Sequence, residues 1–169
     1  MTITYRDARA EDSASLDRIF KSSFGEAFGH LYPPEDLATF LAGFDVARWR
    51  AQLADGAFAF RIAESDGEPI GYVKLGPLRL PVEPGGPALA LDQLYLLKAH
   101  HGAGIASVLL EWAVEEARRR GASELYLTVY PDNLRARGLY DRFGFETVGR
   151  YDFMVGRHAD EDIVMRKSL

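Results

Sequence analysis

The chain has 169 residues, 47% of them hydrophobic, and a formal net charge of −5; this length fits a single domain over residues 1–169. It contains no cysteine, which excludes disulfides, thiolate catalysis and cysteine metal sites, and its acidic balance argues against nucleic acid as a partner while being compatible with a cationic substrate. Because no apolar run is long enough for a membrane span and the first residues are unlike a signal peptide, we expect a cytoplasmic protein with no membrane partner.

The first half of the chain is predicted to form a strand, then helices, then a pair of strands. In chain order these are a strand over 3–6, helices over 11–28, 35–41 and 46–53, and strands over 57–63 and 69–78. The helices are predicted from apolar residues at helical spacing. Pro33-Pro34 separates the first two helices, and Ser65-Asp66-Gly67 between the two strands is typical of a hairpin turn.

The second half is predicted to alternate strands and helices after a loop over 81–87, which holds three prolines and two glycines. The elements that follow are a strand over 89–97, a helix over 104–120, a strand over 124–129, a helix over 133–143, and strands over 145–150 and 163–167. The helix over 104–120 has a broad apolar stripe, which indicates packing against a sheet.

The stretch His101-Gly102-Ala103-Gly104-Ile105-Ala106 opens this helix directly after an apolar strand. Its glycines permit positive φ and let backbone N–H groups come close to a ligand. At a helix N-terminus, free N–H groups and the helix dipole attract anions, so a pyrophosphate is the natural ligand. The alternative is a glycine-rich turn with no ligand. Neither the Rossmann fingerprint nor the Gly-Lys-Ser/Thr of a P-loop is present.

A second motif follows some thirty residues later, as Asn133-x-x-Ala136-x-x-x-Tyr140-x-x-x-Gly144-Phe145. Asn133 is predicted to cap the helix at its start and Gly144 to follow its end. Tyr140 comes seven residues after Asn133, which is two helical turns, so both side chains face the same side.

In this order the two motifs resemble the acyl-CoA-binding half of the GCN5-related N-acetyltransferases, the GNAT family. The first matches the family's Q/R-x-x-G-x-G/A loop, with Gly104 and Ala106 at the small-residue positions and His101 where the family usually has Gln or Arg. The predicted order β-α-α-β-β-β-α-β-α-β-β is also that of the family. The resemblance implies an α/β (α+β) fold with a central mixed, mostly antiparallel sheet of about six or seven strands, flanked by helices and splayed to form an acetyl-CoA cleft.

Within that family the chain most resembles the PaiA-type spermidine/spermine acetyltransferases. Four stretches carry this likeness: Phe24-Gly25-x-x-Phe28-Gly29-His30-Leu31-Tyr32, Asn133 to Arg137, Phe153-Met154-Val155-Gly156 and Asp160-Glu161-Asp162. It implies direct acetyl transfer from acetyl-CoA to a primary amine of a small-molecule acceptor such as a polyamine, with no metal and with a possible homodimer. The alternatives are an enzyme that acetylates protein N-termini, lysines or an antibiotic, and a non-catalytic CoA-binding regulatory domain.

The resemblance implies that Tyr140 donates a proton to the departing CoA sulfur, and the alternative is a core tyrosine. Asp92 is the first candidate for the base that deprotonates the amine. By strand alternation it is expected to share an apolar face with Leu94 and Leu96, where desolvation raises the pKa of a carboxyl. His100, His101 or a chain of water molecules could take that role instead.

The resemblance also implies the remaining site residues. They lie on the strand over 89–97, on the glycine-rich loop and the start of the helix that follows it, and at the cap of the helix over 133–143. Those expected to bind the cofactor are Leu94, Tyr95, Leu96, His101, Gly102, Ala103, Gly104, Ile105, Ala106, Ser107 and Asn133. The first helices and the loop over 81–87 are expected to form the acceptor wall, with Phe28, Tyr32 and Glu35 as candidate contacts. These residues mix aromatic and acidic character, which suits an alkyl polyamine and is equally typical of an amphipathic helix.

Overall fold

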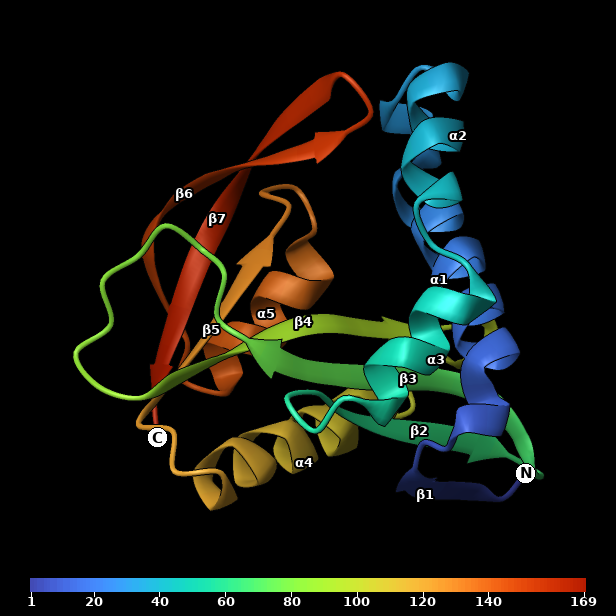
Figure 1. Cartoon of the computed structure of the whole chain (residues 1–169), viewed down its shortest axis with the longest axis horizontal. Helices are drawn as coiled ribbons and strands as arrows, with labels where there is room; N and C mark the ends of the chain where they lie inside the picture. Colours follow the sequence, from blue (N-terminus) through green and yellow to red (C-terminus); the bar gives the residue numbers. More distant parts are fainter.

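The framework of the computed structural model, which describes all of residues 1–169, is one seven-stranded sheet in the order β1-β2-β3-β4-β5-β7-β6 (Figure 1). The strands are β1 Ile3–Asp7, β2 Ala59–Ser65, β3 Glu68–Pro77, β4 Ala88–Leu96, β5 Glu124–Val129, β6 Glu146–Val155 and β7 His158–Ser168. Every neighbouring pair is antiparallel except β4 and β5. The expected mixed, mostly antiparallel sheet is therefore confirmed.

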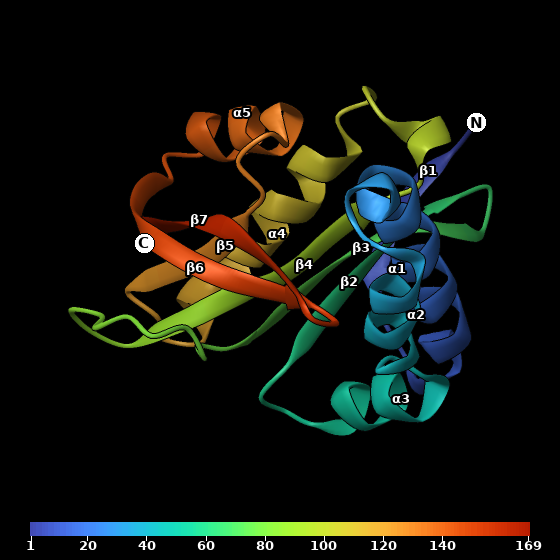
Figure 2. The ribbon, with the colours of Figure 1, turned by 90° about the horizontal axis from the view of Figure 1, so that it is seen from above.

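Helices cover both faces of the sheet (Figure 2). They are α1 Ser13–Phe28, α2 Pro34–Ala42, α3 Val46–Ala54, α4 Ile105–Arg119 and α5 Leu134–Arg142, with short 3-10 turns at Ala10–Asp12, Gly29–Leu31 and Lys98–His100. One hydrophobic cluster lies between the sheet and α4 and α5, and a second lies between the sheet and α1 to α3. The central strands are therefore buried on both faces. None of the helices combines the length and the apolar character needed to cross a membrane.

The sheet is splayed in its middle, because β4 and β5 pair at one end only. Their parallel pairing runs from Ala88 and Glu124 to Ala90 and Tyr126. Beyond this point β4 stays with β3, and β5 stays with β7. Backbone N–H and C=O groups on the edge of β4 that faces β5 thus have no partner strand from Leu91 onward. This opening is the splayed cleft that the sequence led us to expect.

A β-bulge interrupts β4 at Asp92. Lys74 of β3 lies opposite Gln93, whereas the next residue, Leu75, lies opposite Leu91. Asp92 is therefore an extra residue without a partner in the ladder, and such a bulge locally redirects side chains.

The bulge corrects the expected orientation of Asp92. Leu91 and Leu96 belong to the hydrophobic cluster beneath α4, and Leu94 packs against it. The carboxylate of Asp92 instead lies 3.7 Å from Nζ of Lys74, on the face covered by α1 to α3. The prediction that Asp92 shares a face with Leu94 and Leu96 was wrong, because one inserted residue reverses strand alternation.

The C-terminal hairpin is longer than the predicted strands over 145–150 and 163–167. β7 pairs with β5 only from Ile163 onward, so the tip of the hairpin extends past β5 toward α2 (Figure 1). There Oδ1 of Asp36 accepts a hydrogen bond from the backbone N–H of Arg157 at 3.0 Å. Gly156 is needed at this contact, because a Cβ would lie 2.7 Å from Cα of Asp36. The hairpin thus brings residues of β7 to the α1 face of the sheet.

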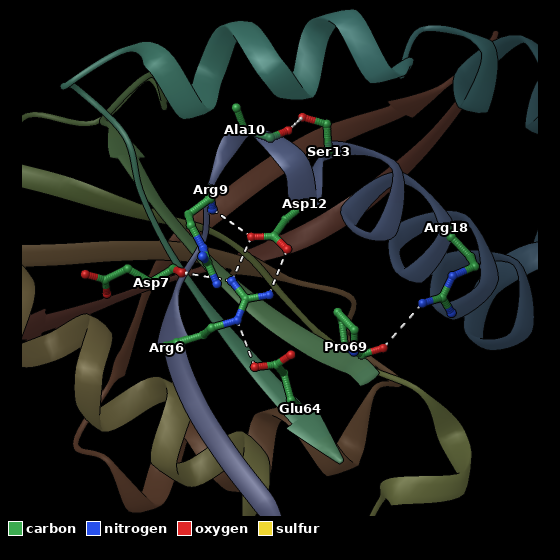
Figure 3. Close-up of polar contacts among 9 residues, drawn as sticks. All are labelled: Arg6, Asp7, Arg9, Ala10, Asp12, Ser13, Arg18, Glu64 and Pro69. Atoms are coloured by element: carbon green, nitrogen blue, oxygen red, sulfur yellow. Dashed lines mark hydrogen bonds and ion pairs between the residues drawn. The ribbon is translucent and has the colours of Figure 1, made fainter. Parts of the chain in front are cut away.

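An ion cluster anchors the start of α1 to the sheet (Figure 3). Arg6 of β1 donates to both carboxylate oxygens of Asp12 and to Glu64 of β2, each at 2.8 Å. Asp12 also accepts from the backbone N–H of Arg9 at 2.7 Å. The Arg6 guanidinium lowers the pKa of Asp12, so the pair is ionised at neutral pH. This cluster fixes the direction of α1, which forms one wall of the site.

Candidate active site

Two cavities meet where β4 and β5 separate. The loop cavity, of about 460 Å³, lies between α1, the end of β4, the start of α4, and α5. The aspartate cavity, of about 130 Å³, lies between α1, β4, the end of β5 and β7, and contains Asp92 and Asp162. The residues that line both are Phe28, Leu94, Tyr95, Asn133, Ala136 and Tyr140. These shared residues form a junction through which a group bound in one cavity can meet a group bound in the other.

The glycine-rich loop has the geometry of an anion site. Gly102 and Gly104 have φ of +85° and +78°, and a Cβ on either would meet nothing within 4 Å, so the loop faces open space. Gly104 is the N-cap of α4 and no side chain caps this helix. The first N–H groups of α4 are consequently free to bind a ligand, and Ile105, Ala106 and Ser107 line the loop cavity.

Basic side chains gather on the wall of the loop cavity. They are Lys98, His101, Arg135 and Arg142. Sequence reasoning identified only His101, although the seven-residue spacing of Arg135 and Arg142 on one helix could have indicated the other cations. All of the expected cofactor residues line this cavity except Ala103. Several positive charges beside free helix N–H groups suit a ligand that carries more than one phosphate.

His101 connects two walls of the loop cavity. Its Nε2 lies 2.9 Å from the carbonyl oxygen of Leu96, and the guanidinium of Arg135 contacts its Nδ1. The ring therefore links the end of β4 to α5 through both of its nitrogens.

Tyr140 and Asn133 occupy the junction from α5. Tyr140 is buried, with its ring 5.7 Å from that of Phe145, and its hydroxyl makes no hydrogen bond within the chain. Burial raises the pKa of Tyr140, so the phenol stays protonated at neutral pH. Asn133 caps α5 by accepting a 3.3 Å hydrogen bond from the N–H of Ala136. Together they place a proton donor and an amide at the meeting point of the cavities.

Asp92 lies in the aspartate cavity next to a buried lysine. Its side chain is 29% exposed, and desolvation raises its pKa, an effect that Lys74 and Arg79 oppose. Desolvation also lowers the pKa of Lys74 to about 8, and the Lys74 ammonium lies 5.1 Å from the ring centre of Phe58. A carboxylate with a raised pKa in a cavity is suited to accept a proton.

The acceptor wall differs in part from the expectation. Phe28 and Tyr32 line the aspartate cavity, whereas the exposed Glu35 lines neither cavity. The loop over 81–87 borders a separate surface depression of about 720 Å³, beside Arg120. Asp162 lines the aspartate cavity and was missed, because no strand was predicted there.

Sequence comparison relates the chain to acetyltransferases. A model of the acetyltransferase (GNAT) family matches residues 14–145. An uncharacterized N-acetyltransferase of Mycobacterium bovis is 31% identical over 159 residues, which cover 94% of this chain and 98% of that protein. An uncharacterized N-acetyltransferase of Lactobacillus delbrueckii subsp. lactis is 29% identical over 163 residues, 94% of this chain and 93% of that protein.

Solved structures share the fold. The PaiA N-acetyltransferase of Thermoplasma acidophilum, solved with coenzyme A, superposes with a TM-score of 0.81 at 20% identity, over 100% of both chains. The ribosomal-protein-alanine N-acetyltransferase of Brucella melitensis gives 0.77 at 25% identity, over 98% of this chain and 99% of that one. The protein yncA of Salmonella typhimurium, solved with acetyl-CoA, superposes with a TM-score of 0.76 at 21% identity. The superposition covers 100% of this chain and 95% of that one.

Proposed function

Since this chain belongs to the GNAT acetyltransferase family and is an acetyl-CoA-dependent N-acetyltransferase, we propose that it transfers the acetyl group directly to a primary amine of a small cation such as a polyamine. One observation carries the choice of acceptor. The cavity that joins the loop cavity at Tyr140 is lined by aromatic rings and two carboxylates, and both kinds of group bind alkylammonium ions. The resemblance to PaiA-type sequences supports the same class.

The size of the aspartate cavity favours a thin acceptor. Its volume of about 130 Å³ is less than a third of the about 460 Å³ of the loop cavity. An alkylamine chain fits this space, whereas an aminoglycoside ring would have to stay outside it. Acetylation of a protein N-terminus or of a lysine side chain is the second candidate, because those acceptors also present a slender amine.

In this proposal the cofactor occupies the loop cavity. The pyrophosphate binds the free N–H groups at the start of α4, and Arg135, Arg142 and Lys98 balance its charge. The pantetheine follows the unpaired edge of β4 past Leu94 and Leu96, which places the thioester at the junction. A backbone N–H of β4 then polarises the thioester carbonyl.

The reaction exchanges one bond and needs three proton transfers, because an ammonium that becomes an amide loses two protons and the sulfur gains one. After the first proton has left, the amine nitrogen attacks the thioester carbon, a C–N bond forms, and the C–S bond breaks. The sulfur leaves as a thiolate that takes a proton from Tyr140, and the second proton of the nitrogen, released as the amide forms, restores the Tyr140 phenol. The amine must lose its own proton first, and for an alkylamine of pKa about 10.4 this costs about 4.6 kcal/mol at pH 7.

We assign the first proton of the ammonium to Asp92, which accepts it directly or through one water molecule. Asp92→Asn is expected to lower kcat while acetyl-CoA binding is kept, because an amide cannot accept the proton. A base works only when deprotonated, so wild-type kcat should fall as the pH drops through the raised pKa of Asp92, and this inflection should be absent from the variant. Asp152→Asn, an exposed position on β6, is the matched control. An unchanged profile would point to water molecules that carry the proton to bulk solvent.

The acceptor class is tested by acetyl-CoA turnover with a panel of amines. We expect polyamines and other small alkylamines to be acetylated with a higher kcat/KM than peptides or aminoglycosides. Added salt should weaken the preference for polycations, because it screens charge attraction. A panel led by peptides would favour the second candidate. Binding of acetyl-CoA without any turnover would indicate a regulatory domain instead.

A further inference from the structure

Asp162 of β7 is a buried carboxylate that the rest of the chain leaves without a partner. The residue is only 7% exposed and lines the aspartate cavity. It takes part in no side-chain hydrogen bond or ion pair, and its charged neighbour is a second carboxylate, Asp160. Burial and Asp160 together raise the pKa of Asp162 to about 7. A buried carboxylate without a counter-charge is unfavourable, which indicates that its partner comes from outside the chain.

Asp160 does have partners within the chain, although its side chain lies on the same face of β7 as that of Asp162. One oxygen of Asp160 accepts a hydrogen bond from the hydroxyl of Tyr32, and the other lies 3.4 Å from Nε2 of His158. Asp160 is thus held by donors of the chain. The carboxylate of Asp162 is left free to face the cavity.

The position of Asp162 separates it from the reacting atoms. Tyr140 lines both cavities, whereas Asp162 lines the aspartate cavity alone. An amine that reacts beside Tyr140 is at the junction, whereas Asp162 is among the residues that line the aspartate cavity alone, together with the aromatic residues Phe24, Tyr32 and Phe153. Such rings suit an alkyl chain that carries an ammonium group.

We propose that Asp162 binds a second, protonated amine of the acceptor while the first amine attacks at Tyr140, so that the enzyme selects aliphatic diamines and polyamines over monoamines. This assignment rests on the proposed acetylation of small amines. Asp162 is then a specificity-determining residue. It gives binding energy to the non-reacting end of the acceptor, and that energy positions the reacting end.

The test measures kcat/KM for 1,4-diaminobutane and for n-pentylamine and takes the ratio of the first to the second. The two amines have the same length, but n-pentylamine has a methyl group in place of the second ammonium. Asp162→Asn should lower this ratio by about 10- to 100-fold, the range for a charge-assisted hydrogen bond. The ratio is the measured quantity, because general damage to the enzyme cancels in it. Glu161→Gln is the matched control. It removes the same charge one residue away, at an exposed side chain 3.8 Å from Arg150, and should leave the ratio unchanged.

The outcomes separate this assignment from the proposed function. Equal loss of rate with both amines in a folded Asp162→Asn enzyme would overturn the assignment and make Asp162 a base or a structural residue. A wild-type ratio near one, or a ratio that Asp162→Asn does not change, would also overturn it while the amine acetyltransferase stands. A wild-type enzyme that binds acetyl-CoA and acetylates neither amine would overturn the proposed function itself.

Discussion

Tyr140→Phe is expected to lower kcat by about 10²- to 10⁴-fold, the usual contribution of a general acid, with little change in the KM for acetyl-CoA. The substitution removes one hydroxyl at the junction of the two cavities and keeps the ring that packs against Phe145. The thiolate would then leave without a proton donor. Because burial raises the pKa of Tyr140, the wild-type phenol stays protonated through neutral pH, and the loss should be similar across that range.

A second buried tyrosine provides the control for this loss. Tyr126 of β5 is 2% exposed, lines neither cavity, and has its hydroxyl 3.4 Å from Glu124. Tyr126→Phe removes a buried hydroxyl of the same kind and should leave kcat unchanged. If Tyr140→Phe retains wild-type activity with a good acceptor, Tyr140 is a core tyrosine and the proton comes from another group.

The parts of the site that the sequence predicted are those fixed by short-range geometry. The strand over 124–129 was placed at its observed bounds, and positive φ was expected at Gly102 and Gly104 and is observed. The helix cap at Asn133 and the two-turn spacing to Tyr140 also depend only on helix geometry. Such features are readable from one sequence because each depends on a few neighbouring residues.

The features that were missed depend on contacts between distant segments. The bulge at Asp92 is a property of the register between β3 and β4, and the sequence of β4 alone contains no sign of it. On its β7 side the tip of the hairpin, residues 157–162, is polar apart from Ala159, so it lacks the apolar pattern of a strand. The tip is held by Asp36, more than a hundred residues earlier. Asp162 lies on that hairpin, which explains why sequence reasoning did not place it in the site.

Cofactor binding offers the second large effect. Ala106→Glu should abolish the rise in melting temperature that acetyl-CoA or CoA gives the wild-type protein. Ala106 lies in the first turn of α4 and lines the loop cavity, so a glutamate adds bulk and a negative charge where the pyrophosphate is proposed to bind. Two like charges about 4 Å apart repel by about 4 kcal/mol at an effective dielectric constant of about 20, which corresponds to roughly a 10³-fold loss of affinity.

The control for this variant is a glutamate on the same helix outside the cavity. Val108 is 39% exposed and lines neither cavity, so Val108→Glu should bind acetyl-CoA as the wild type does. Ligand at about 100 times its Kd adds about 2.7 kcal/mol to the stability of a native state that alone binds it. The rise in melting temperature is therefore readily measured. NAD should give no such rise. An undiminished acetyl-CoA shift in Ala106→Glu would place the pyrophosphate elsewhere. The wild-type shift would then have to arise from Lys98, Arg135 and Arg142, because these cations and the start of α4 are the groups in the loop cavity that can balance several phosphate charges.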